Sequence, residues 1–287
     1  MILVDIGNSG LRATRVEDRE QFEDQRVFRL SWSAAVASQR KPSPEQEAAP
    51  DQRWCLLGDV SAFDWLVSQF KSYPNEEWLI SCVQQTALKE LVHSLQRGGV
   101  RSNVRIVRYT DLSMEIDVEQ PAQTGIDRLL SASAAYWLHQ QSNPQDHQPI
   151  IIVQAGTAVT VDLVDENGAF RGGAIMPGLG LALQLLAAGT DQLPWLGNHV
   201  VDSTPKLPGK NTTQAISAGV NAALVGGVVH LIGRYREVCS DRMVYVSGGD
   251  GKLLLPHIEP PVLCVEHLVL RGLALVANRP VSVRHGQ

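Results

Sequence analysis

A short polar run follows the first apolar residues of the chain and has the composition of a phosphate-binding turn. It comprises Asp5, Ile6, Gly7, Asn8, Ser9, Gly10, Leu11 and Arg12. A glycine lets the backbone approach a phosphate closely, and neighbouring amides then point at its oxygens. Asn8 and Ser9 add side-chain donors, and Arg12 is placed to reach the phosphates. Asp5 is a candidate Mg²⁺ carboxylate, acting through water because Mg²⁺ keeps much of its hydration. The structural alternative is a plain hairpin.

A second run of this kind lies near the middle of the chain. Residues 151–158 (IIVQAGTA) resemble residues 2–9 (ILVDIGNS), and each run is followed by another strand-like segment. Gly156 and Thr157 then form a second phosphate-type turn, and the alternation that follows places Thr160 and Asp162 on one strand face. A chance match is possible for so short a pattern. Its position at the start of each half favours duplication.

Other side chains suit phosphoryl transfer, each with a structural alternative. Asp127 lies in the first turn of a helix opened by Thr124, where it either complements the helix dipole or accepts a substrate hydroxyl proton. Arg128 either pairs with a surface acid or holds an anion. Thr212 begins a helix and is a candidate cap. A late glycine pair follows an apolar strand and is otherwise a strand-to-helix turn; it comprises Ser247, Gly248 and Gly249.

Composition and missing motifs exclude several classes. The chain has 287 residues, a net charge of −5 and a pI of about 5.9, so no nucleic-acid surface is expected. Walker and dinucleotide-binding glycine motifs are absent, and neither the eight histidines nor the four cysteines form a zinc pattern. No signal peptide is recognisable, and the longest apolar stretch, 222–232, is shorter than the ~18 residues of a membrane span. We therefore expect a cytoplasmic protein without a membrane partner and with a buried helix at 222–232.

Alternating strands and helices must position these residues. Strands are predicted at 2–6, 11–16, 25–31, 54–58, 78–83, 104–109, 150–154, 158–164, 169–175, 242–247 and 262–265. Helices are predicted at 61–71, 85–97, 125–139, 179–188, 212–239 and 266–277. Polar stretches at 41–53 and 140–149 predict an inserted loop and a linker. The pattern predicts an α/β fold with mixed sheets, and two such domains would leave a ligand cleft between them.

Taken together, these motifs resemble those of the type III pantothenate kinases, members of the superfamily that includes acetate and sugar kinases, Hsp70 and actin. Six motifs occur in the order that the family has them. The matching residues are Asp5, Gly7, Asn8 and Ser9; Gly125, Asp127 and Arg128; Gly156, Thr157, Ala158, Thr160 and Asp162; Gly172, Gly173, Ile175, Pro177 and Gly178; Gly209, Lys210, Asn211 and Thr212; Gly248 and Gly249. The resemblance spans nearly the whole chain.

The resemblance implies a fold and a reaction. The fold would be two similar actin-like (ribonuclease H-like) domains, 1–143 and 144–287, with mixed sheets and an ATP cleft between them. The reaction would be transfer of the γ-phosphoryl of ATP to pantothenate, giving 4′-phosphopantothenate in the first step of coenzyme A biosynthesis. Mg²⁺ and a homodimer are also implied.

The resemblance further implies a role for each group of residues. Asp127 would be the base, and the substrate would contact Gly125, Ile126, Asp127, Arg128 and Thr212. The 5–12 run with Gly156 and Thr157 would bind the phosphates, and Ser247, Gly248 and Gly249 would lie near the adenosine. The segment 172–178 would shape the cleft floor, with Pro177 starting a helix.

One position departs from the family. Gln154 stands where the family usually has an aspartate associated with a monovalent cation, K⁺ or NH₄⁺. An amide oxygen can join a K⁺ shell but supplies no negative charge. The alternatives left open are a kinase or phosphohydrolase of this fold with another substrate, and a non-catalytic ATP-binding relative. A dinucleotide oxidoreductase lacks its glycine fingerprint.

Overall fold

The computed structural model describes residues 1–17, 22, 26–33, 50–57, 59–100, 103–145, 147–197, 204–239 and 242–277. The chain divides into two compact units. The first comprises Met1–Ser113, Ala122–Ala134 and Val269–Gln287, and the second Met114–Pro121 and Ala135–Leu268. The domain limits 1–143 and 144–287 stay a prediction.

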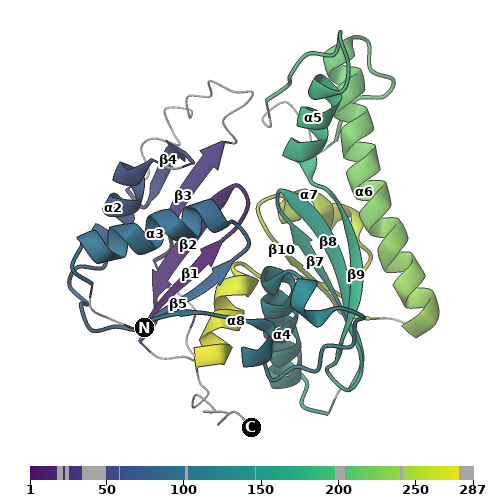
Figure 1. Cartoon of the computed structure of the whole chain (residues 1–287). Helices are drawn as coiled ribbons and strands as arrows, with labels where there is room; N and C mark the ends of the chain where they lie inside the picture. The colour runs from purple at the N-terminus through teal and green to yellow at the C-terminus, as the bar shows by residue number, and fades with distance from the viewer. Residues whose placement is uncertain are drawn as a thin grey trace. The chain divides into compact units, whose positions relative to one another are not determined.

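The first unit contains a six-stranded mixed sheet (Figure 1). Its strands are β1 (Ile2–Ile6), β2 (Gly10–Arg15), β3 (Phe28–Ser33), β4 (Gln52–Leu56), β5 (Trp78–Cys82) and β6 (Val104–Ile106). They lie in the order β4-β3-β2-β1-β5-β6. β2 is antiparallel to both β1 and β3, whereas β5 is parallel to β1 and β6. The predicted glycine turn therefore connects β1 to β2.

Helices cover both faces of this sheet. Alternate residues of β1, including Val4 and Ile6, pack into a core beneath α2 (Val60–Ser68) and α3 (Gln85–Arg97). The opposite face carries Leu3 and Asp5. A guanidinium on that face, from Arg105, donates to the Val276 carbonyl of α8 (Leu268–Ala277) at 3.5 Å. α8 packs closely on the start of α4 (Ile126–Ser142), since a Cβ at Gly272 would lie 2.3 Å from the Leu130 carbonyl oxygen.

The second unit repeats the arrangement with five strands. They are β7 (Ile150–Ala155), β8 (Ala158–Val164), β9 (Phe170–Pro177), β10 (Val244–Ser247) and β11 (Val262–Cys264), in the order β11-β10-β7-β8-β9. β7, β8 and β9 are antiparallel neighbours, and β10 is parallel to β7 and β11. This is the pairing of β1, β2, β3, β5 and β6, so the predicted duplication extends to the whole sheet.

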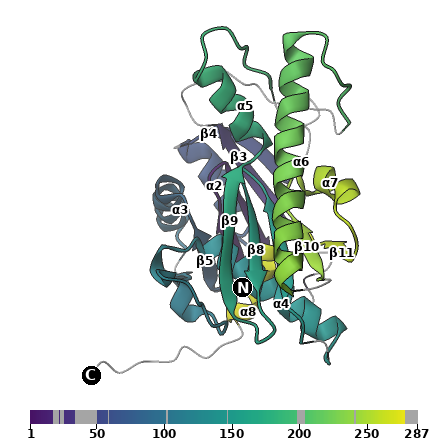
Figure 2. The ribbon, with the colours of Figure 1, turned by 90° about the vertical axis from the view of Figure 1, so that its right-hand side faces the viewer.

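Helices α5 (Leu179–Ala188) and α6 (Thr212–Cys239) lie against the second sheet (Figure 2), and the short α7 (Gly251–Leu254) follows β10. Val153, Val159 and Val161 point into the core that these helices cover. Gln154, Thr160 and Asp162 therefore lie on the other face, which confirms the alternation predicted for Thr160 and Asp162. On that face the His139 side chain of α4 lies 3.3 Å from the Tyr245 hydroxyl.

Most predicted elements are confirmed within a few residues, with four corrections. The strand predicted to reach 109 ends at Ile106, because the Asp111 carboxylate accepts from the Arg108 amide and starts a 3₁₀ turn at Tyr109. The predicted linker 140–149 begins later, since α4 continues to Ser142. Pro177 ends β9 rather than starting α5, whose N-cap is Gly178. The predicted loop 41–53 lies outside the described residues up to 49, and its predicted end is wrong, because β4 begins at Gln52.

Helix α6 is long and apolar enough to cross a membrane by length and composition alone. An 18-residue window within Thr212–Glu237 has a mean hydropathy of 1.8. One face, however, packs in the core of the second unit through Ile216, Val220, Leu224, Val228 and Ile232. A core helix passes the same test of length and composition, and this packing accounts for the inward apolar residues. The prediction of a buried helix is correct for that face, while the opposite face is exposed.

Candidate active site

Three polar side chains form a row across neighbouring strands of the first sheet. Asp5 on β1 is paired with Arg12 on β2 and with Ser81 on β5. Directly paired residues place their side chains on the same sheet face, so the three lie side by side. Arg12 Nη1 donates to Asp5 Oδ2 at 3.5 Å. The row lies where β1 ends and the 7–10 turn begins.

The Asp5 carboxyl is almost completely buried, with 4% of its surface exposed. Burial raises its pKa to about 6, against the lowering effect of Arg12; the nearby Asp127 carboxylate raises the pKa further, and Ser81 lowers it. At neutral pH most of the population is ionised. A buried carboxylate of this kind is a hard oxygen donor whose charge a bound cation would offset, which fits the site for Mg²⁺.

Asp127 lies in the first turn of α4 and contributes the second carboxylate. Its Oδ1 accepts from the Arg128 amide at 3.0 Å, and burial raises its pKa. Gly125 permits this placement, because a Cβ there would lie 2.6 Å from Asp127 Oδ1. The helix terminus favours the ionised form while burial opposes it. The result is a carboxylate more basic than an exposed one, close enough to Asp5 to affect its pKa.

The turn between β1 and β2 is held by its backbone. The Gly7 amide donates to the Gly10 carbonyl at 2.8 Å, and the Trp32 indole donates to the Asn8 carbonyl at 2.8 Å. Asn8 and Ser9 are exposed, as phosphate contacts require. Gly10 must lack a Cβ, which would lie 2.7 Å from the Leu30 carbonyl oxygen. The Ile6 and Leu11 side chains lie in the core, so these two residues offer only backbone groups.

The second unit builds its glycine turn from three converging loops. The Gly178 amide donates to the Thr157 carbonyl at 3.0 Å, and the Asp250 amide to the Ala155 carbonyl at 3.2 Å. A Cβ at Gly178 would lie 2.0 Å from the Gly156 oxygen, and one at Gly248 would lie 2.1 Å from the Ala155 oxygen. Gly248 also has a φ of +98°, which favours glycine. The predicted Gly156–Thr157 and Ser247–Gly249 segments therefore lie together.

The polar row of the second sheet is uncharged. Gln154 on β7 is paired with Thr160 on β8 and Ser247 on β10. Thr160 is buried, and its hydroxyl has no hydrogen-bond partner in the part of the chain that the structure describes. The row thus offers neutral oxygens, and the weak cation site at Gln154 stays a prediction.

Thr212 is the first residue of α6 but does not cap it. The Asn211 side chain accepts from the Gln214 amide at 2.9 Å, and the Gln214 side chain accepts from the Lys210 amide at 2.7 Å. Asparagine is the stronger N-cap, so the predicted capping role of Thr212 is wrong. The Thr212 side chain is exposed. Its substrate contact stays a prediction.

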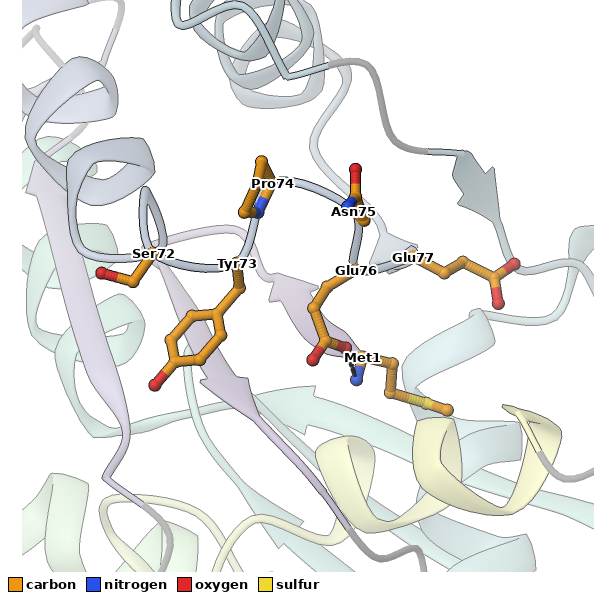
Figure 3. Close-up of a pocket in the computed structure, with 7 residues that line it drawn as sticks. All are labelled: Met1, Ser72, Tyr73, Pro74, Asn75, Glu76 and Glu77. Carbon is orange, nitrogen blue, oxygen red and sulfur yellow. Dashed lines mark ion pairs between the residues drawn. The ribbon is translucent and has the colours of Figure 1, made fainter.

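A pocket of about 500 Å³ lies at the other end of β1 and β5 and does not coincide with these carboxylates (Figure 3). Its lining residues are Met1, Ser72, Tyr73, Pro74, Asn75, Glu76 and Glu77. Glu76 pairs with the Met1 ammonium and, at 2.9 Å, with Arg15, which also stacks on Tyr73. Glu76 is thus occupied in holding the strand ends together.

Sequence reasoning missed Ser81, which lies beside Asp5. The apolar strand that carries it showed no motif. A signal was nevertheless present, because Ile80-Ser81 and Val246-Ser247 occupy the same place in the duplicated sheets. A buried and a half-buried carboxylate, a guanidinium and an open turn of backbone amides can bind a phosphorylated ligand with its metal and accept a proton. With the duplicated mixed sheets, these groups define a phosphotransferase with an actin-like fold.

Comparison with known proteins gives the particular family. A family model described as type III pantothenate kinase matches residues 1–234. A type III pantothenate kinase of Rhodopirellula baltica is 39% identical over 199 residues, covering 68% of this chain and 69% of its own. That of Herminiimonas arsenicoxydans is 35% identical over 283 residues, covering 96% and 97%. The chain therefore belongs to the type III pantothenate kinase family.

Solved structures agree on the fold. A Campylobacter jejuni protein described as a Baf-family transcriptional activator has a TM-score of 0.54 at 18% identity, covering 96% of both chains. A propionate kinase of Francisella tularensis has a TM-score of 0.51 at 8% identity, covering 95% of this chain and 97% of its own. At such identities the likeness concerns the fold, which is that of the actin-like kinases.

Proposed function

We propose that this chain transfers the γ-phosphoryl of ATP to the primary hydroxyl of pantothenate, with Asp127 as general base and Asp5 as the Mg²⁺ carboxylate. Family membership supports the reaction. The observation that carries the assignment of roles is a pair of carboxylates, the buried Asp5 and the half-buried Asp127, which are close enough to interact electrostatically. The non-catalytic alternative is favoured by no observation.

Asp127 suits the role of general base because its surroundings raise the pKa of its carboxyl. Burial raises its pKa, and its Oδ1 accepts from the Arg128 amide, which fixes the carboxylate at the start of α4. Phosphoryl transfer needs mainly positioning and charge stabilisation, with one carboxylate orienting the nucleophile and accepting its proton. The neighbouring Arg128 is proposed to hold the pantothenate carboxylate, for which a guanidinium fork is well shaped.

Asp5 suits the metal because it combines a hard oxygen donor with nearly complete burial. When bound, Mg²⁺ would offset the phosphate charge during transfer. Asp5 would hold it through water, with Arg12 alongside for the phosphates. The exposed Asn8 and Ser9 would contact phosphate oxygens through the β1–β2 turn. The Gly156–Thr157 and Ser247–Gly249 segments are proposed for the rest of ATP, and Thr212 for a substrate contact.

The test is product formation from Mg-ATP by purified protein. We expect 4′-phosphopantothenate, identified by mass spectrometry, and ADP release that depends on pantothenate. Pantoate and β-alanine serve as controls that each carry part of the acceptor. ADP release without pantothenate would indicate a phosphohydrolase. Binding of ATP without any ADP release would indicate a non-catalytic relative.

A homodimer is proposed as well, and the exposed face of α6 supports it. Small or apolar residues recur there at alternating spacings of four and three, as on a helix that packs against another helix. They are Ala215, Gly219, Ala222, Gly226, Val229 and Gly233. Nothing lies within 4 Å of a Cβ built at Gly219, Gly226 or Gly233, so a second helix has room to approach.

Light scattering tests the dimer. Gly226→Arg on this face should give a monomer, and Lys252→Glu on the exposed part of α7 should not. A natural protein that is monomeric at micromolar concentration would refute the dimer.

A cytoplasmic location is also proposed, supported by Cys55, Cys82 and Cys264, which are free thiols.

A further inference from the structure

Ser81 is a buried hydroxyl beside the metal carboxylate, and no motif drew attention to it. Its surface is 0% exposed, and strand register places it next to Asp5 on the same sheet face. Its hydroxyl has no partner that meets strict hydrogen-bond geometry within the described residues. It is nevertheless close enough to Asp5 to act on that carboxyl as a hydrogen bond that lowers its pKa.

These two observations are compatible because hydrogen bonds at catalytic sites are often long or poorly aligned before ligand binds. Leaving a buried donor unsatisfied is unfavourable. The acceptor beside it in the row is the Asp5 carboxylate. Strand register and burial together leave Asp5 as the polar side chain next to this hydroxyl in the row.

The flanking of Asp5 has a mechanical consequence. β2 and β5 lie on opposite sides of β1, so Arg12 and Ser81 approach the carboxylate from opposite sides. The terminal torsion of an aspartate is otherwise broad and only two-fold. A contact on each side restricts that torsion. The carboxylate then presents its remaining oxygen lone pairs in a fixed direction.

The second sheet supports a role for this position. Ser247 lies on β10 beside Gln154, in the same parallel register as Ser81 beside Asp5. The same hydroxyl residue thus stands next to the polar residue of the first strand in both halves. A serine placed only for packing would have no reason to recur beside the one polar residue of each strand.

We propose that Ser81 is a positioning residue whose hydroxyl donates to the Asp5 carboxylate and holds it in the orientation that binds the hydrated metal of a nucleotide. The inference rests on the proposed role of Asp5 and deepens it. Groups around a metal ligand of this kind influence metal affinity by roughly tenfold or more. Ser81 acts through Asp5 and touches neither substrate nor metal.

The test is calorimetric titration of the full chain with ATP, with and without Mg²⁺. We expect the gain in ATP affinity that Mg²⁺ provides to fall roughly tenfold in Ser81→Ala. Affinity for metal-free ATP should stay unchanged. Ser81→Cys keeps the shape but donates weakly, so it should lose most of the gain too. Thr14→Val is the matched control, since it deletes a buried hydroxyl of the same sheet that donates to the Arg26 carbonyl.

The outcomes separate positioning from packing. A full Mg²⁺-dependent gain in Ser81→Ala would overturn the proposal. So would an impaired Ser81→Ala with a normal Ser81→Cys, because that pattern indicates packing alone. If Ser81→Ala does not fold, the Mg²⁺-dependent gain in ATP affinity of Ser81→Cys decides: a lost gain supports the proposal and a full gain overturns it. Failure of the proposed function would look different, since the natural protein would bind Mg-ATP with the full gain but form no phosphopantothenate.

Discussion

The two sheets offer the same three positions to polar side chains and fill them differently. In the first sheet the row β2-β1-β5 holds Arg12, Asp5 and Ser81. In the second the row β8-β7-β10 holds Thr160, Gln154 and Ser247. The serine is common to both, while the charged pair occurs in only one. Duplication therefore preserved the backbone frame, and substitution at two positions made one row ionic and the other neutral.

The charged row of the first sheet affects both the stability of the fold and the binding of a cation. A buried carboxylate with a pKa of about 6 destabilises the folded state at neutral pH, because an unfolded aspartate ionises near 3.8. Arg12 offsets part of this cost. The second row carries no such cost, because its three residues Gln154, Thr160 and Ser247 are uncharged. Asp127 adds a second carboxylate near the first row, so the proposed proton transfer and the proposed metal binding both fall in that unit.

The largest effect is expected from removing the second carboxylate. Asp127→Asn keeps the shape of the side chain and deletes its basicity. Turnover with saturating pantothenate should fall by roughly 10²–10⁴-fold, the usual range for loss of a general base. The Asp5 carboxyl should ionise more readily in this variant, because a neighbouring negative charge is gone. Stopped assays and thermal unfolding check both rate and fold. A folded variant with near-normal turnover would leave Asp127 as a helix-terminus carboxylate only.

The next effect comes from making the first row resemble the second. Asp5→Asn should lose most Mg²⁺-dependent activity. It should also gain stability at pH 7.5, by at most about 3 kcal/mol, because a shift of one pKa unit corresponds to about 1.4 kcal/mol. The folded pKa is raised, so the stability contribution of Asp5 is full below pH 4 and is lost as pH rises through about 6.

Urea unfolding at pH 4 and at pH 7.5 tests that sign. The stability gain of Asp5→Asn should be present at the higher pH and nearly vanish at the lower one. Turnover of the natural protein should fall as pH decreases through about 6, where Asp5 becomes protonated. A variant equally stabilised at both pH values would show that the effect of Asp5 is not electrostatic.

The sequence predicted the strands of both sheets because apolar runs bounded by glycine turns are strong local signals. It placed Asp127 within the first turn of its helix because Thr124 was expected to open that helix. Ser81 was missed because its partner Asp5 lies far away in sequence, and only strand register brings them together. The cap of α6 was missed because Asn211 and Thr212 are both acceptable, and the choice depends on how Gln214 folds back.

The pKa of Asp5 was equally out of reach of the sequence. It depends on the burial of the carboxyl within the folded sheet, on Arg12 and Ser81 from neighbouring strands, and on the Asp127 carboxylate from α4. These are contacts between segments distant along the chain. Local patterns reveal which side chains are polar, whereas their protonation depends on which of them become buried together.

The smallest effect concerns the reverse exchange, in which the second row is made acidic. We expect initial rates of the natural protein to respond weakly or not at all to K⁺ or NH₄⁺, because Gln154, Thr160 and Ser247 supply only neutral oxygens. Gln154→Asp adds a carboxylate beside a buried hydroxyl that lacks a hydrogen-bond partner within the described chain. A cation there would gain both an anionic and a neutral ligand, so this variant should acquire saturable K⁺ activation.

The measurement is initial rate against K⁺ concentration in a buffer of large organic cations, with Gln154→Asn as the neutral control. Strong saturable K⁺ activation of the natural protein would contradict the expectation and show that neutral oxygens suffice at this row. Complete inactivity that Gln154→Asp reverses would instead show that the charge lost from the second sheet is needed for catalysis.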